Sequence, residues 1–300
     1  MKVTVGLPFF NNEATLADAI RSVYAQTSHD WELILVDDGS ADRSFEVARR
    51  VQDPRVRLVR GDCNRGLSAR LNQIAHLARG LYLARMDADD LMHPQRLARQ
   101  IAVLDAQPEV ELVGSAMYSL DHGDRPRGIR GHTPPDVSPL GVLRHAPLVH
   151  PTITARTEWF LRNPYNEDCH RSEDRELYVR TFPRLKFVQL SDPLYFCREE
   201  FSLRLDKYQR SCREDRAIFR QYGPELAGTL RTWALCLASM LKAQVYRSFS
   251  AVHAERFLVR QRNTPVNEAQ TRQALQVLRQ VLETPVPGLD RVDDHRSIAS

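Results

Sequence analysis

Residues 80–90 read Gly80-Leu81-Tyr82-Leu83-Ala84-Arg85-Met86-Asp87-Ala88-Asp89-Asp90, an apolar segment that passes directly into a group of carboxylates. Residues 81–86 have the length and character of a buried strand that stops at Asp87. Because alternate residues of an extended segment point the same way, Asp87 and Asp89 would face one space. Two carboxylates there repel each other unless a cation accompanies them, and their hard oxygens suit Mg²⁺ or Mn²⁺. The alternative is that these acids only form a turn before Pro94.

Upstream of this segment, predicted strands alternate with predicted helices. Apolar, β-branched runs indicate the strands, and apolar residues at helical spacing indicate the helices. The strands are predicted at residues 3–7, 31–36 and 56–59, and the helices at 16–26, 43–51 and 68–78. Gly80 would stop the last of these helices. This β-α-β pattern predicts a mostly parallel sheet covered by helices.

Polar residues follow three of the predicted strands, at Pro8-Phe9-Phe10-Asn11, Asp37-Asp38-Gly39-Ser40 and Asp87-Ala88-Asp89-Asp90. Ligands of parallel sheets bind beyond the carboxyl ends of the strands, so we expect these three segments to form one site. A carboxylate such as Asp38 can accept hydrogen bonds there from a nucleobase or a ribose. The alternative for Asp37 or Ser40 is a helix cap.

The pattern is less regular downstream. Residues 121–141 are rich in Gly, Pro, His and Arg and predict a surface loop. The other predicted elements are helices at 94–104, 173–181, 226–247 and 266–282, with a further helix from residue 206, and strands at 110–115, 148–151, 153–155 and 186–190.

Composition indicates an ordinary globular protein. The 300 residues are 42% hydrophobic and 27% charged, enough for one large domain or a main domain with an appendage. No apolar stretch approaches the ~20 residues of a membrane-spanning helix, and the start is too short for a secretory signal. We therefore expect a cytoplasmic location. The five cysteines contain no Cys-x-x-Cys pair and predict neither a disulfide framework nor a zinc site.

The net charge of +4 is unevenly distributed, and residues 198–220 hold seven Arg and Lys residues. Such a run can face phosphates, nucleic acid or an anionic membrane. Acidic residues are interspersed through the run, which favours a solvated helix face, and we expect no nucleic-acid partner.

Five blocks of the sequence closely resemble the opening of the family 2 glycosyltransferases. They are residues 5–13, 22–27, 35–42, 64–72 and 80–90, with a thinner match to about residue 205. The resemblance implies a GT-A fold, an α/β domain over residues 1–205. Its parts would be a nucleotide-sugar-binding half over 1–115 and an acceptor-binding half over 116–205, followed by a helical extension over 206–300. It also implies inverting transfer from a UDP-sugar to a glycan or lipid-linked hydroxyl, in bacterial cell-surface polysaccharide synthesis.

The same resemblance implies roles for individual residues on the donor side. Asp38 would contact uracil, and Arg70 would face the diphosphate. Asp87 would lie near the ribose and metal-bound water, Ala88 would be among the donor-binding residues, and Asp89 would be the direct ligand of Mn²⁺ or Mg²⁺. The residues expected around the base and ribose are Pro8, Phe10, Asn11 and Glu13.

On the acceptor side, residues 172–180 resemble the Glu-Asp block of the family. We assign proton removal to Asp174 and expect Glu173 to hold a sugar hydroxyl, with His150 upstream as a structural residue. The alternative is that both acids only stabilise the dipole of a helix that they open. Many members carry a His a few residues after the strand that ends near Arg198, where this chain has Glu200. The third metal ligand is therefore open, and Arg198 or Arg204 would contact the diphosphate instead.

Three other functions compete with a transferase. A nucleotidyltransferase would usually show a Gly-rich, basic loop after the first strand, where this chain has residues 8–11. A nucleotide-sugar hydrolase and a non-catalytic nucleotide-sugar-binding module stay as alternatives. For residues 233–241 a core helix is favoured, and the alternative is an amphipathic segment at the inner face of a membrane.

Overall fold

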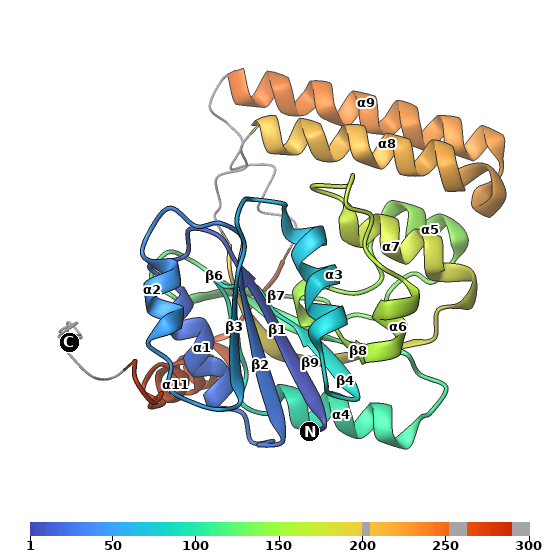
Figure 1. The fold of residues 1–300 in the computed structure, drawn as a ribbon. Helices are drawn as coiled ribbons and strands as arrows, with labels where there is room; N and C mark the ends of the chain where they lie inside the picture. The colour runs from blue at the N-terminus through green and yellow to red at the C-terminus, as the bar shows by residue number, and fades with distance from the viewer. Residues whose placement is uncertain (200–204, 252–262, 290–300) are drawn as a thin grey trace.

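The structure is a computed structural model that describes residues 1–199, 205–251 and 263–289 (Figure 1). Strands and helices alternate through the first part, and helices dominate the last part. The strands are β1 (Val3–Phe9), β2 (Trp31–Asp37), β3 (Val56–Arg60), β4 (Tyr82–Arg85), β5 (Leu91–Met92), β6 (Leu112–Leu120), β7 (Pro126–Arg130), β8 (Thr154–Arg156), β9 (Phe187–Arg198) and β10 (Thr264–Pro265). The α-helices are α1 (Leu16–Tyr24), α2 (Ser44–Arg49), α3 (Leu67–Leu77), α4 (Arg96–Ala106), α5 (Pro139–Arg144), α6 (Thr157–Arg162), α7 (Glu173–Thr181), α8 (Leu205–Ala227), α9 (Thr229–Ala251) and α11 (Glu268–Leu282).

The strands join one sheet in the order β10-β7-β6-β8-β4-β1-β2-β3, with β9 beside β6 and paired to β5. The first four strands are parallel, which confirms the prediction for this half. The second half is mixed, because β8 and β7 run antiparallel to their neighbours while β9 runs parallel to β6. The sheet is thus less uniformly parallel than the β-α-β pattern indicates.

Two local predictions were wrong. Residues 126–130 form β7, which pairs with β6, although the Gly- and Arg-rich composition of 121–141 predicts a loop. Gly80 does not stop α3, since that helix ends at Leu77. A Cβ at Gly80 would lie 2.5 Å from the amide nitrogen of Thr4, so glycine is needed there for the close approach of two backbone segments.

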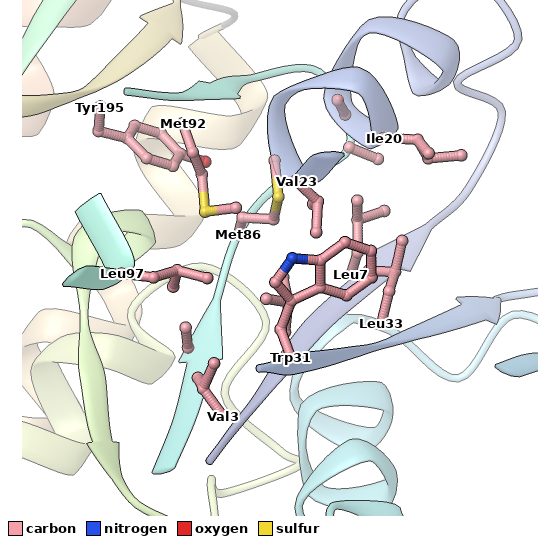
Figure 2. Packing of buried hydrophobic residues seen from close by; sticks show 14 of the residues in the cluster. Val3, Leu7, Ile20, Val23, Trp31, Leu33, Met86, Met92, Leu97 and Tyr195 are labelled. Atoms are coloured by element: carbon pink, nitrogen blue, oxygen red, sulfur yellow. The ribbon is translucent and has the colours of Figure 1, made fainter. Parts of the chain in front are cut away.

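The core lies on both faces of the parallel strands. Alternate residues of β2 divide between two buried clusters. Leu33 packs with α1, α2 and α4, whereas Ile34 packs with α3, α6 and α7. Figure 2 shows Trp31, Leu33, Leu7 and neighbouring side chains packed together in the first cluster. Burial on both faces fixes the strand register, so the polar strand ends occur at one edge.

The C-terminal helices take two different positions. Helices α8 and α9 pair with each other and pack over α5 and α7 (Figure 1). Helix α11 instead packs against β5, β6 and β9, and β10 pairs with β7. The boundary expected at residue 205 stays a prediction, although β10 joins the sheet of the first part and α11 packs against it. None of the helices in the described ranges is long and apolar enough to cross a membrane.

Candidate active site

The ends of β1, β2 and β4 bring the predicted polar segments to one edge of the sheet. Phe9 at the end of β1 is in register with Asp37, and Gly6 with Arg85. Pro8 is buried within β1 opposite Val36, whereas Phe10 just beyond the strand is 43% exposed. Phe10 therefore offers an aromatic face at this edge.

Asn11 and Glu13 hold the loops after β1 and β2 together. The Asn11 amide donates to Ser40 Oγ at 3.0 Å, and Asn11 Oδ1 accepts from the Ala41 amide at 2.8 Å. Glu13 Oε2 accepts from the Arg43 amide at 3.0 Å. Asn11 has a positive φ of 55°, which asparagine adopts more readily than most residues. These two predicted donor-site residues position the loops that would surround a nucleotide.

The carboxylate of Asp38 is buried and accepts three hydrogen bonds within the protein. Its Oδ1 accepts from the Arg65 amide at 2.8 Å and from Arg70 Nε at 2.6 Å, and its Oδ2 accepts from the Gly66 amide at 2.9 Å. Arg70 also donates to the carbonyl of Cys63 at 2.7 Å. The ion pair therefore fixes the loop before α3. Arg70 lies against Asp38, and its contact with a diphosphate stays a prediction.

Asp37 stabilises a different segment from Asp38. Its Oδ1 accepts from the Ser40 amide at 2.9 Å, so it stabilises the turn after β2. Helix α2 begins later, at Ser44, and has no side-chain cap. The helix-capping alternative for Asp37 and Ser40 was therefore wrong.

Asp87, Asp89 and Asp90 form a carboxylate cluster after β4, with one oxygen of each within 4.8 Å of the others. Asp87 pairs with the buried Arg85, and Asp90 Oδ1 accepts from the Arg198 amide at 2.9 Å. Burial, then the charge of Asp89, raises the pKa of Asp90 well above its usual range. An exposed Asp89 beside two further carboxylates fits a hard divalent cation.

Three contacts anchor this cluster, two at its backbone and one at the Asp90 side chain. The carbonyl of Ala88 accepts from Thr15 Oγ1 at 3.0 Å, and the Asp87 amide donates to the hydroxyl of Tyr195 at 3.0 Å. The third is the contact from Arg198 to Asp90. The carboxylates are thus held in place by α1 and β9, which are remote from β4 in the sequence.

A cleft of about 1660 Å³ opens beside the cluster. Asp87 lines it from the end of β4, and Asp174 lines it from the first turn of α7. Asp174 Oδ1 accepts from the Arg175 amide at 2.7 Å, and burial raises the pKa of the Asp174 carboxyl. The cleft brings a predicted donor residue and the predicted base into one space.

Comparison with known families now identifies the chain. Residues 4–170, more than half of it, match the family described as Glycosyl transferase family 2. The chain belongs to glycosyl transferase family 2. It is therefore a glycosyltransferase, as the five sequence blocks indicate.

Individual relatives agree with this assignment. EpsE of Bacillus subtilis, named a glycosyltransferase, is 33% identical over 208 residues, which are 66% of this chain and 73% of that protein. WfgD of Escherichia coli is named a UDP-Glc:alpha-D-GlcNAc-diphosphoundecaprenol beta-1,3-glucosyltransferase. It is 30% identical over 102 residues, 34% of this chain and 40% of that protein.

The fold also matches solved structures. TarS 1-349 of S. aureus in complex with UDP-GlcNAc has a TM-score of 0.60 at 17% identity, over 95% of this chain and 82% of that one. At this identity the likeness concerns the fold, and it confirms the GT-A architecture for this family 2 glycosyltransferase.

Arg198 and Arg204 were expected to contact the diphosphate, and the structure describes only the first of them in this family 2 glycosyltransferase. Arg198 lies beside the carboxylate cluster, but its guanidinium is paired with Asp124 at 2.7 Å and with Asp18 at 3.1 Å. Its contact with a diphosphate stays a prediction. Arg204 and Glu200 lie outside the described residues.

Glu173 is the more buried of the two acids that open α7. It is 8% exposed, and its Oε2 has no hydrogen-bond partner among the described residues. Burial, then the charge of Asp174, raises the pKa of Glu173 to about 7. His150 Nδ1 lies 4.0 Å from Glu173, and burial lowers the pKa of His150 well below its usual range. His150 Nε2 also contacts Tyr165 Oη at 2.8 Å, which agrees with a structural role.

Arg85 is a site residue that sequence reasoning missed. It is buried in β4, pairs with Asp87, and lies close enough to Glu173 and Asp174 to oppose the rise in their pKa values. A cation inside the apolar run 81–86 is an available signal, because an arginine is rarely buried without a partner. Arg85 connects the donor and acceptor carboxylates electrostatically.

Proposed function

We propose that this glycosyltransferase moves a sugar from a UDP-sugar to a hydroxyl of a glycan or lipid-linked acceptor, with inversion. The proposal places it in bacterial cell-surface polysaccharide synthesis. The main support for this proposal is that Asp87 and Asp174, which come from different elements, line the same cleft. The named activity of WfgD, with a UDP-sugar donor and a lipid-linked acceptor, supports these substrate classes.

The donor nucleotide would lie along the edge formed by β1, β2 and β4. The exposed ring of Phe10 would stack on the base, while Asn11 and Glu13 hold the two surrounding loops. Asp38 would accept a hydrogen bond from uracil next to its partner Arg70. The complex of TarS with UDP-GlcNAc supports a UDP-sugar on this fold.

Asp89 is proposed as the direct ligand of Mn²⁺ or Mg²⁺, with Asp87 and Asp90 beside it. Asp89 is exposed, whereas Asp87 is paired with Arg85 and Asp90 accepts from the Arg198 amide. The bound ion would supply positive charge to neutralise the diphosphate as it leaves.

Asp174 would remove the proton of the acceptor hydroxyl as that oxygen forms a bond to the anomeric carbon. The bond from that carbon to the diphosphate oxygen breaks, and its electron pair leaves with UDP. Burial raises the pKa of Asp174, which makes it a stronger base than an exposed aspartate. Glu173, next to it, would hold a hydroxyl of the sugar.

The test is incubation with a panel of labelled UDP-sugars, Mn²⁺ and a bacterial cell extract as the source of acceptors. Label in a larger glycan supports transfer. Free labelled sugar as the sole product indicates a hydrolase, and binding without turnover indicates a non-catalytic module. Either result would overturn the proposal, and the Asp174→Asn protein serves as the inactive control.

The exposed face of helix α9 bears on where in the cell the protein is located. Residues 233–241 were predicted as a core helix, but only one face of that segment is buried, for example Cys236. The opposite face carries exposed apolar side chains at helical spacing. This α9 ridge consists of Leu230, Trp233, Leu237, Met240, Leu241 and Val245.

We propose that the α9 ridge rests on the inner face of an anionic membrane. Arg247, an exposed cation of the same helix that does not line the cleft, complements anionic lipid headgroups. The test is sedimentation with phosphatidylglycerol or phosphatidylcholine vesicles. We expect Trp233→Gln to reduce binding to the anionic vesicles, while the exposed Leu81→Gln control does not. Equal binding by both variants would refute the contact.

A further inference from the structure

The cleft that holds Asp87 and Asp174 is strongly basic. Seven Arg and Lys residues line it, against four aspartates and no glutamate. Two of the cations are neutralised within the protein, since Arg130 pairs with Glu199 and Arg175 pairs with Asp215. The remaining cations determine the charge that an acceptor would meet.

Five cations of the cleft have no side-chain hydrogen bond or ion pair with any residue of the described ranges. They come from the end of α5, the segment before α7, and helices α8 and α9, so they converge on one concave space from four parts of the chain. We call them the basic wall, which consists of Arg144, Arg171, Lys207, Arg231 and Lys242.

The pKa of His145 reflects the positive charge of this space. Partial burial lowers its pKa, and Arg175, Lys242 and Arg144 lower it further. The nearby Asp136 acts in the opposite direction and does not cancel them. Solvated cations are common on convex surfaces. Here the cations instead lie together in the cleft that a substrate would enter, where they repel one another.

We propose that the basic wall binds a phosphate group of the acceptor. The inference rests on the proposed function and names the acceptor's chemical class. An acceptor with its hydroxyl at Asp174 would have the rest of its length in the same cleft, against these cations. A lipid-linked sugar diphosphate and a phosphate-bearing soluble glycan present the same anionic group.

The experiment measures equilibrium binding with saturating UDP and Mn²⁺, so that the donor site is filled. The ligands are farnesyl phosphate, glucose 1-phosphate and the uncharged octyl glucoside. The variant is Arg231→Gln/Lys242→Gln. Its matched control is Arg213→Gln/Arg220→Gln, two exposed cations of α8 that do not line the cleft.

We expect wild-type protein to bind both phosphate ligands more tightly than octyl glucoside. Loss of two partly solvated charge contacts should weaken phosphate binding by about tenfold in the cleft variant and leave the control unchanged. Tighter binding of farnesyl phosphate than of glucose 1-phosphate, which carries the same phosphate monoester, would assign the phosphate to a lipid carrier, and equal affinity would assign it to a soluble glycan.

Equal losses in the two double variants, an unchanged cleft variant, or equally tight binding of octyl glucoside would overturn the inference. The measurement requires no turnover, so it is separable from the proposed function. If wild-type protein transferred no sugar but the basic wall still bound phosphate, the proposed function alone would fail. If transfer occurred and phosphate binding did not depend on the wall, only the inference would fail.

Discussion

Replacing Glu173 with glutamine is expected to stabilise the protein at alkaline pH and to change its stability much less in acid. The carboxyl of Glu173 is buried, and its Oε2 has no hydrogen-bond partner among the described residues. Its nearest basic group, His150, has a pKa well below the usual range and is therefore neutral. Arg85 and Arg171 compensate ionised Glu173 only in part, since its pKa in the folded state still rises to about 7.

The magnitude follows from the pKa of about 7 in the folded protein, against an ordinary value of 4.5. A carboxyl with a raised folded pKa holds its proton more tightly when folded, so stability falls as pH rises from about 4.5 through 7. The gap corresponds to a cost of ~3 kcal/mol at pH 8 and under ~1 kcal/mol at pH 5. Glutamine does not ionise, so Glu173→Gln avoids this cost.

The assay is urea unfolding followed by tryptophan fluorescence at pH 5, 6.5 and 8. The matched control is Glu158→Gln, which changes an exposed glutamate in the first turn of α6. Burying an amide at position 173 adds a constant cost, so the decisive quantity is the change in the variant's effect with pH. A Glu173→Gln effect that is the same at pH 5 and pH 8 would refute the reasoning.

The remaining predictions concern the donor and acceptor carboxylates. Asp174→Asn should lower turnover by about 10²–10⁴-fold while leaving donor affinity unchanged, and full turnover in this variant would remove Asp174 as the base. Because burial raises the pKa of Asp174, the acid limb of a kcat/KM profile should lie above the pH at which an ordinary aspartate titrates, and a limb at or below that pH would contradict this. Asp89→Asn should raise the Mn²⁺ concentration for half-maximal activity by at least about tenfold, as expected for loss of a metal ligand, and an unchanged metal titration would reject that role. Asp38→Ala leaves Arg70 as an unpaired buried cation and should cost about 3–5 kcal/mol of folding free energy in urea unfolding. Adding Arg70→Met to Asp38→Ala should recover part of that loss of folding free energy. If the effects of the two substitutions simply added, the Asp38–Arg70 ion pair would not account for the loss.

Local pattern was sufficient for most of the elements that form the site. The apolar run before Asp87 is a strand because its side chains are buried on both faces, and the polar residues after it mark the strand end. Glu173 begins a helix at the predicted residue, since acids are favoured in a first turn. Strand β7 was missed because its polar, Gly-containing sequence is stabilised by pairing with β6 rather than by its own periodicity.

The sequence by itself determined the order of strands and helices and the chemical types that follow β1, β2 and β4, because periodicity and turn residues act between near neighbours. Tertiary structure alone decided which charges meet. It paired Asp38 with Arg70, placed Arg85 between the two carboxylate groups, and left the α9 ridge exposed. The Asp38–Arg70 pair and the influence of Arg85 on Glu173 and Asp174 involve residues remote in the chain. Their energies depend on burial and distance, which no local pattern specifies.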